Sequence, residues 1–200
     1  MRLLVRVAAD SRILKWSQRV LLSVAFLSLG YCGFVMLDAW TFQRAELREF
    51  NRIVSVAPPA ISMRDPGPPV ADALLGRIEV GRIGVSAMIV EGTTTSALRR
   101  AAGHIASTGM PGVPGNIGIA AHRDTFFRPL RNIRKNDIIT ITTMRAEYRY
   151  RVLSTKIVDP SDISVLDPSE DEILTLVTCY PFYFVGSAPQ RFVVRAERII

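Results

Sequence analysis

Short apolar runs separated by glycine, proline and aspartate make up most of the chain after residue 75. Alternating or continuous apolar positions of this length predict β-strands, and the residues between them predict turns. The strands are expected at 77–80, 85–91, 116–122, 138–144, 148–154, 156–158, 174–179 and 191–196. Only 94–102, which opens with a threonine cap, and 125–130 favour short helices. About eight short strands with one or two small helices favour an antiparallel or mixed β-barrel.

The pattern is different near the N-terminus, where no charged residue occurs from Val20 to Leu37. As a helix, this stretch is just long enough to cross the ~30 Å hydrocarbon core of a bilayer. Asp38 and Trp40 then lie at the far interface. A cleaved signal peptide has a similar pattern, but its apolar region is usually ~7–15 residues long, and no convincing A-x-A site follows this one. We therefore expect an uncleaved transmembrane anchor.

Charge and composition divide the chain further. Five basic residues precede the span against a single acid, Asp10, which predicts a cytoplasmic N-terminus and an extracytoplasmic remainder. After the span, 41–51 is polar and favours helix, and 57–70 holds five prolines, as in an extended stalk. We expect four parts: a basic cytoplasmic segment at 1–19, the anchor at 20–40, a juxtamembrane helix and stalk at 41–74, and a globular domain at 75–200.

The net charge of +7 does not indicate a nucleic-acid-binding protein. Four of these charges belong to residues 1–19, which leaves +3 for the other 181 residues. That remainder has no run of Lys and Arg interleaved with aromatic residues. We expect no nucleic-acid partner.

Three residues at strand ends carry the candidate chemistry. The chain has two cysteines, and because Cys32 lies in the span, Cys179 has no disulfide partner in the exported part. An unpaired thiol is either a small buried hydrophobe or a nucleophile. A nucleophilic thiol needs a base, for which His122 is a candidate, and a donor for the oxyanion, for which Arg191 is a candidate. Together they suit cysteine acyl transfer.

The segments GHIASTGMPGVPGNIGIAAHRDTFF and LTLVTCYPFYFVGSAPQRFVV, with the order His, Cys, Arg, resemble sortases, above all the class D-like branch. The resemblance covers about residues 75–200. It implies an eight-stranded sortase-type β-barrel and a cysteine transpeptidase with His122, Cys179 and Arg191 as site residues. One departure is Ala121, where many relatives have glycine.

The resemblance also implies the partners. Such an enzyme cleaves an LPxTG-like sorting signal of a secreted protein, holds the protein as a thioacyl intermediate, and passes it to an amine such as a peptidoglycan stem peptide or a pilin lysine. No organic cofactor or metal is expected. The alternatives are a cysteine peptidase that releases the protein to water and a non-enzymatic surface module on the same barrel. A peptidoglycan-crosslinking transpeptidase is disfavoured because no SHGC-type motif occurs.

Three further features have weaker claims. His104 is the competing imidazole, for which we expect a structural role. The acidic segment 159–172 lacks the spacing of a known calcium loop, so we expect a solvated loop beside the substrate groove. Thr178 either orients the site or is an ordinary strand residue.

Overall fold

A computed structural model describes residues 11–56, 71–184 and 186–199, with only the backbone described at 11, 13 and 53–56. The expected stalk at 57–70 lies outside the described residues. The chain divides after Trp40 into two compact units, Met1–Trp40 and Thr41–Ile200, and each is considered by itself.

The first unit contains most of one long helix, α1 (Ser11–Val56). Its apolar part is strongly hydrophobic, and none of its most apolar stretch is buried within the protein. Large side chains such as Phe26 and Leu27 are 73% and 75% exposed. By length and composition, this helix is therefore able to cross a membrane. The helix continues beyond the apolar part to Val56, so the polar segment after Trp40 is helical, as expected.

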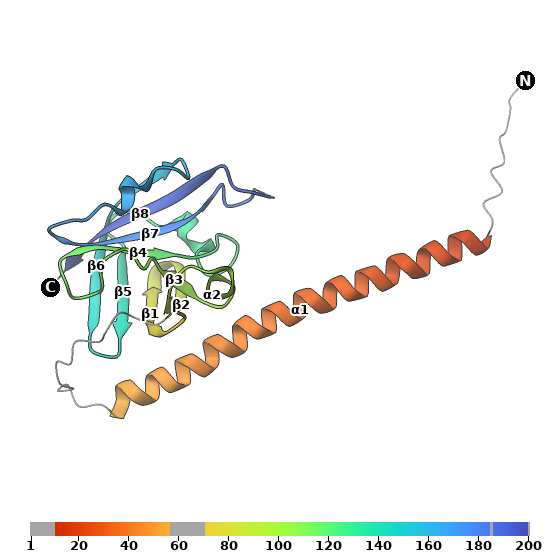
Figure 1. The fold of residues 1–200 in the computed structure, drawn as a ribbon, viewed down its shortest axis with the longest axis horizontal. Helices are drawn as coiled ribbons and strands as arrows, with labels where there is room; N and C mark the ends of the chain where they lie inside the picture. The colour runs from red at the N-terminus through yellow and green to blue at the C-terminus, as the bar shows by residue number, and fades with distance from the viewer. Residues whose placement is uncertain (1–10, 57–70, 185, 200) are drawn as a thin grey trace, which may run out of the picture. The chain divides into compact units, whose positions relative to one another are not determined.

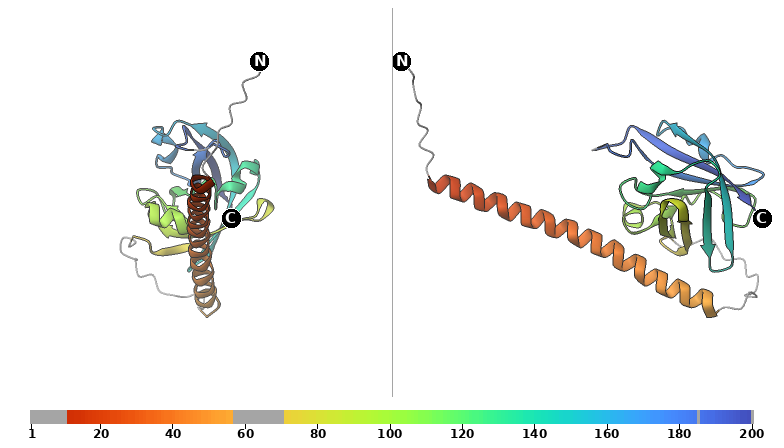
Figure 2. Two further views of the ribbon diagram at one scale, coloured as in Figure 1. Left: turned by 90° about the vertical axis from the view of Figure 1, so that its right-hand side faces the viewer. Right: turned by 180° about the vertical axis from the view of Figure 1, so that it is seen from behind.

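The second unit is built around a closed barrel of eight strands in the order β1-β2-β3-β4-β7-β8-β6-β5, which Figures 1 and 2 show from three sides. This confirms the eight-stranded β-barrel with short helices. The strands are β1 (Leu74–Val80), β2 (Val85–Glu91), β3 (Ala102–His104), β4 (Gly115–Ala120), β5 (Ile138–Thr143), β6 (Glu147–Val158), β7 (Glu172–Tyr180) and β8 (Gln190–Ile199). The helices are α2 (Thr95–Arg100) and the 3-10 turns η1 (Gly81–Ile83), η2 (Arg128–Asn132) and η3 (Ile163–Leu166).

Two strands differ from the sequence expectation. The separate strands expected at 148–154 and 156–158 are one strand, β6, with an irregularity in its register between Val152 and Ser154. In the sequence, the polar residues after Val152 interrupt the apolar alternation and so resemble a break between strands. In the structure they continue the strand and are exposed to solvent. The other difference concerns β3, because a helix was expected to run to Ala102 and no strand was expected at 102–104. Three residues are too few to show a strand periodicity.

The core fills the barrel with one side of each long strand. Ile78 on β1, Ile117 on β4, Ile141 on β5 and Leu174 on β7 are all fully buried. Tyr150 on β6 is also fully buried, and its hydroxyl donates to the carboxylate of Glu172. Burial, followed by this contact, raises the pKa of Tyr150. The apolar core thus fixes the strand ends, and with them the residues that the strands present.

The part of α1 that belongs to the second unit packs directly on the barrel. Phe42 contacts the small cluster of Val90, Ala97 and Ala101. Gln43 accepts a hydrogen bond from the backbone N–H of Met88 on β2 at 2.9 Å and donates to the carbonyl oxygen of Arg100 at 2.7 Å. Because β3 pairs with β2 only at residues 89–91, Gln43 covers an edge that β3 leaves open.

Candidate active site

Cys179 and Arg191 lie directly opposite each other on neighbouring strands. β7 and β8 pair antiparallel, and their register sets Cys179 against Arg191. Figure 1 shows the two strands as neighbours in the barrel. Cys179 is a free, half-buried cysteine near the end of β7. Arg191 is half-buried at the start of β8, where its Nη1 donates to the carbonyl oxygens of Ala188 at 3.3 Å and Gln190 at 3.1 Å.

His122 reaches the same place from another strand. β4 pairs with β7 in parallel, and Ala120 lies beside Val177. If this register is continued by two residues along each strand, His122 comes beside Cys179. The pairing continues past the end of β4 through the N–H of Ala121, which donates to the carbonyl oxygen of Val177 at 3.3 Å. Thr178 adds a side-chain link, because its buried hydroxyl donates to the carbonyl oxygen of Ala121 at 2.7 Å. Thr178 thus fixes the segment that carries the histidine.

The three residues line one cavity of about 340 Å³. Its other lining residues are Arg123, Asp124, Gly186, Ser187 and Ala188. They come from the connections after β4 and between β7 and β8. A thiol, an imidazole and a guanidinium around a groove of this size have the chemical means for acyl transfer through a thioester. The three residues singled out from the sequence are therefore brought together.

Two residues of this region were not predicted from the sequence as site residues. Asp159 follows Val158, the partner of Arg191 on β6. Hydrogen bonds from the side chain and backbone of Ser161 hold the pKa of Asp159 below its ordinary value, and the charge of Arg191 lowers it further. The other is Arg123, which bonds to the β7–β8 connection. In the sequence, only its position next to His122 indicated that Arg123 belongs to the site.

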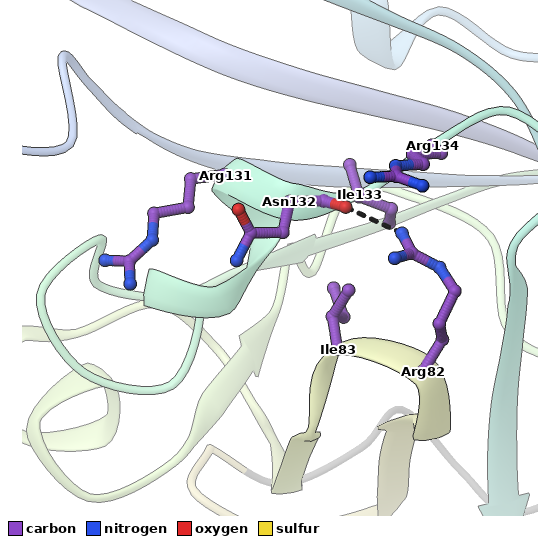
Figure 3. A pocket seen from close by; sticks show the side chains of 6 residues that line it. All are labelled: Arg82, Ile83, Arg131, Asn132, Ile133 and Arg134. Atoms are coloured by element: carbon purple, nitrogen blue, oxygen red, sulfur yellow. Dashed lines mark hydrogen bonds between the residues drawn. The ribbon is translucent and has the colours of Figure 1, made fainter.

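A larger cavity, of about 490 Å³, lies at η1 and η2 and is distinct from the cysteine groove (Figure 3). It is lined by Arg82, Ile83, Arg131, Asn132, Ile133 and Arg134. Arg82 makes a two-pronged ion pair with Asp137, with both bonds at 2.5 Å, and its Nη2 also donates to the carbonyl oxygen of Asn132 at 2.6 Å. The hydrogen bonds from Arg82 lower the pKa of Asp137. No thiol or imidazole lines this cavity.

His104 has the structural role expected of it. It is 2% exposed on β3, with Nδ1 2.8 Å from the carboxylate of Glu91 and Nε2 2.9 Å from the carbonyl oxygen of Gly109. The hydroxyl of Thr108 lies 3.1 Å from the same Nε2 and accepts the N–H of Gly118 on β4 at 2.9 Å. This polar cluster ties β2, β3 and β4 together. Within the described part of the chain, no group of three or more His, Cys, Asp or Glu residues could hold a metal ion.

Comparison with known proteins places this barrel in a family. Residues 78–199 match the family model of the sortase domain. The chain belongs to the sortase family, whose members are cysteine transpeptidases.

Individual relatives agree with this assignment. The chain is 30% identical to Sortase D of Bacillus subtilis (strain 168) over 189 residues, which cover 90% of this chain and 96% of the relative. It is 35% identical to Sortase A of Listeria monocytogenes serovar 1/2a over 112 residues, which cover 54% of this chain and 50% of the relative. Among solved structures, a Sortase D5 transpeptidase of Clostridium perfringens is similar with a TM-score of 0.67 and 27% identity, over 80% of this chain and 99% of that one.

Proposed function

We propose that the protein is a membrane-anchored sortase that cleaves an LPxTG-like sorting signal and transfers the cleaved protein to an amine. Cys179 is the nucleophile, His122 the general acid and base, and Arg191 the residue that steadies the substrate and the developing negative charge. The observation that supports these roles best is the strand register, which sets Cys179 opposite Arg191 and continues from the β4–β7 pair to His122.

The reaction has two halves. The thiolate of Cys179 attacks the carbonyl carbon at the cleavage site, and the negative charge passes to the carbonyl oxygen, near the donors of Arg191. The C–N bond then breaks, and His122 gives its proton to the leaving amine. An incoming amine next attacks the thioester carbonyl and gives up its proton to His122, and the thiolate leaves. Atoms and charge balance without a cofactor.

The location follows from α1. Basic residues precede its apolar part, including Arg12, Lys15 and Arg19. The positive-inside rule therefore favours a cytoplasmic N-terminus and an extracytoplasmic barrel. On that side the enzyme meets secreted proteins that carry a C-terminal sorting signal, and amines such as those of peptidoglycan stem peptides or pilin lysines.

The test uses the purified full-length chain in detergent and a fluorescent sorting-signal peptide, with increasing concentrations of an added amine. A peptide–amine conjugate that grows at the expense of the hydrolysis product supports transfer. Hydrolysis product alone at every amine concentration refutes transfer and leaves a cysteine peptidase. Cleavage that persists unchanged in Cys179→Ala refutes the nucleophile, and no cleavage of any sorting peptide by the wild type refutes the enzyme class for this chain.

A further inference from the structure

One arginine side chain bridges two segments that both line the cysteine groove. Arg123 lies in the connection after β4, next to His122. Its Nη2 donates to the carbonyl oxygen of Phe184 at 2.7 Å and to that of Gly186 at 3.0 Å, both in the connection between β7 and β8. The guanidinium carbon also lies 5.9 Å from the centre of the Phe184 ring. A single side chain thus holds together residues that are more than 60 positions apart in the sequence.

Other contacts hold the two ends of the bridged connection: Phe182 packs against the core, and Arg191 donates to the carbonyl oxygen of Ala188. Among the described residues of 181–189, the backbone hydrogen bond within the connection is long, from the N–H of Phe184 to the carbonyl oxygen of Pro181 at 3.3 Å. Tyr183 is 75% exposed and Phe184 46% exposed, so neither is anchored in the core. Charge-assisted hydrogen bonds are roughly twice as strong as neutral ones. Arg123 is therefore the side chain that ties Phe184 and Gly186 to the histidine segment in the described structure.

The position of the bridge matters for the site. The connection leaves β7 one residue after Cys179 and enters β8 one residue before Arg191, and Arg123 follows His122 directly. Thr178 fixes the histidine segment on one side, through the carbonyl oxygen of Ala121. Arg123 fixes it on the other side, against the connection that closes the groove. Hydrogen bonds therefore hold the residues on both sides of His122.

The guanidinium of Arg123 also has an unused hydrogen-bond donor. Nη1 of Arg123 is enclosed and has no hydrogen-bond partner in the described structure. A buried donor without an acceptor is costly, and one that belongs to a charged group especially so. Because Arg123 lines the groove, an oxygen atom of a bound peptide is a suitable acceptor. Since Nη1 is enclosed, this contact requires the connection to shift from its described position.

We propose that Arg123 is a positioning residue that clamps the β7–β8 connection over the Cys179 groove, and that a main-chain carbonyl oxygen of the bound peptide completes its hydrogen bonding. The clamp controls access to the thiol and holds the closed groove around the peptide. The contact between Arg123 and a bound peptide rests on the proposed function. The hold of Arg123 on the β7–β8 connection concerns the protein alone.

The test compares Arg123→Lys with Arg128→Lys in the full-length chain. Lysine keeps the positive charge but lacks the planar fork that spans two carbonyl oxygens. Arg128 is the matched control, because it is an exposed arginine in the same connection whose side chain has no hydrogen bond or ion pair in the part of the chain that the structure describes. Thermal unfolding of both variants checks that the fold is kept, and Arg123→Gln serves as a second variant.

The first readout is the rate at which iodoacetamide alkylates Cys179, followed on the Cys179 peptide by mass spectrometry so that Cys32 does not interfere. We expect Arg123→Lys to be alkylated at least about threefold faster than the wild type and Arg128→Lys to match the wild type. Equal rates in all three proteins overturn the clamp. This readout needs no enzymatic activity, so it stands even if no sorting peptide is cleaved.

The second readout is the KM for a sorting-signal peptide. The loss of a charge-assisted hydrogen bond corresponds to roughly a tenfold change in an equilibrium constant. We therefore expect the KM of Arg123→Lys to rise about tenfold, with a smaller change in kcat. A KM within twofold of that of Arg128→Lys overturns the peptide contact. If KM rises without faster alkylation, the contact stands and the clamp is refuted.

Discussion

The buried hydroxyl of Thr178 allows the site to be perturbed without changing any group that lines it. Thr178 is 3% exposed, and its hydroxyl donates to the carbonyl oxygen of Ala121 at 2.7 Å. Thr178→Val keeps a β-branched side chain on the strand and removes only the donor. Since Ala121 precedes His122, the lost bond is the one that fixes the histidine segment to β7.

The size of the effect follows from the burial of this bond. A buried acceptor that loses its donor costs about 1–3 kcal/mol. For a protein of this size, each kcal/mol lowers the melting temperature by about 2–4 °C, so about 2 kcal/mol corresponds to about 4–8 °C. A displacement of a reacting group by 1 Å costs about a hundredfold in rate, and a smaller shift of His122 still costs about tenfold in kcat/KM.

Thr175→Val is the matched control. Thr175 lies on the same strand, is 1% exposed, and donates to the side-chain oxygen of Asn116 at 2.7 Å. Both variants should lose similar stability in thermal unfolding, but only Thr178→Val should lose peptide-cleavage activity at a temperature where both are folded. Equal kcat/KM values in the two variants would refute the positioning of His122 by Thr178.

Three other predictions concern stability. Because hydrogen bonds from Arg82 lower the pKa of Asp137 from 3.8, the pair stabilises the fold above the unfolded pKa and is lost as the pH falls through the folded one. Asp137→Asn should therefore be less stable than the wild type by about 1–3 kcal/mol at pH 7, with the gap closing below about pH 4 in unfolding titrations. Gly76→Ala should lose about 1–3 kcal/mol, since its Cβ would lie 2.3 Å from a backbone carbonyl oxygen on β5, whereas Gly81→Ala, in open space, should lose far less in the same assay. Gln43→Ala removes two bonds to the barrel and should lower the melting temperature by about 2–6 °C; an unchanged value would show that α1 does not brace β2.

The sequence predicts the barrel well because its longer strands are apolar, either at alternate positions or over continuous runs. The runs that became β2, β4, β7 and β8 are apolar over lengths typical of strands, and their cores are buried as the pattern requires. The errors occurred where this signal fails. β3 is three residues long, and the outer half of β6 is polar because it faces solvent.

The sequence predicted the three candidate site residues but not the side chains that hold their segments in place. Cys179, His122 and Arg191 stand at the ends of recognisable runs, within motifs that resemble sortases. The bonds of Arg123 to the β7–β8 connection and of Gln43 to β2 join segments far apart in the chain. Contacts between polar side chains and backbone atoms leave no periodicity, so only the fold reveals them.

The central claim is that Cys179 carries the acyl intermediate. Its most direct test is mass spectrometry of the full-length protein, quenched in acid during reaction with a sorting-signal peptide. We predict an adduct with the mass of the peptide fragment on the amino side of the cleavage site, located at Cys179 and discharged by an added amine. Peptide cleavage without such an adduct, or the same adduct on the Cys179→Ala protein, would contradict the account.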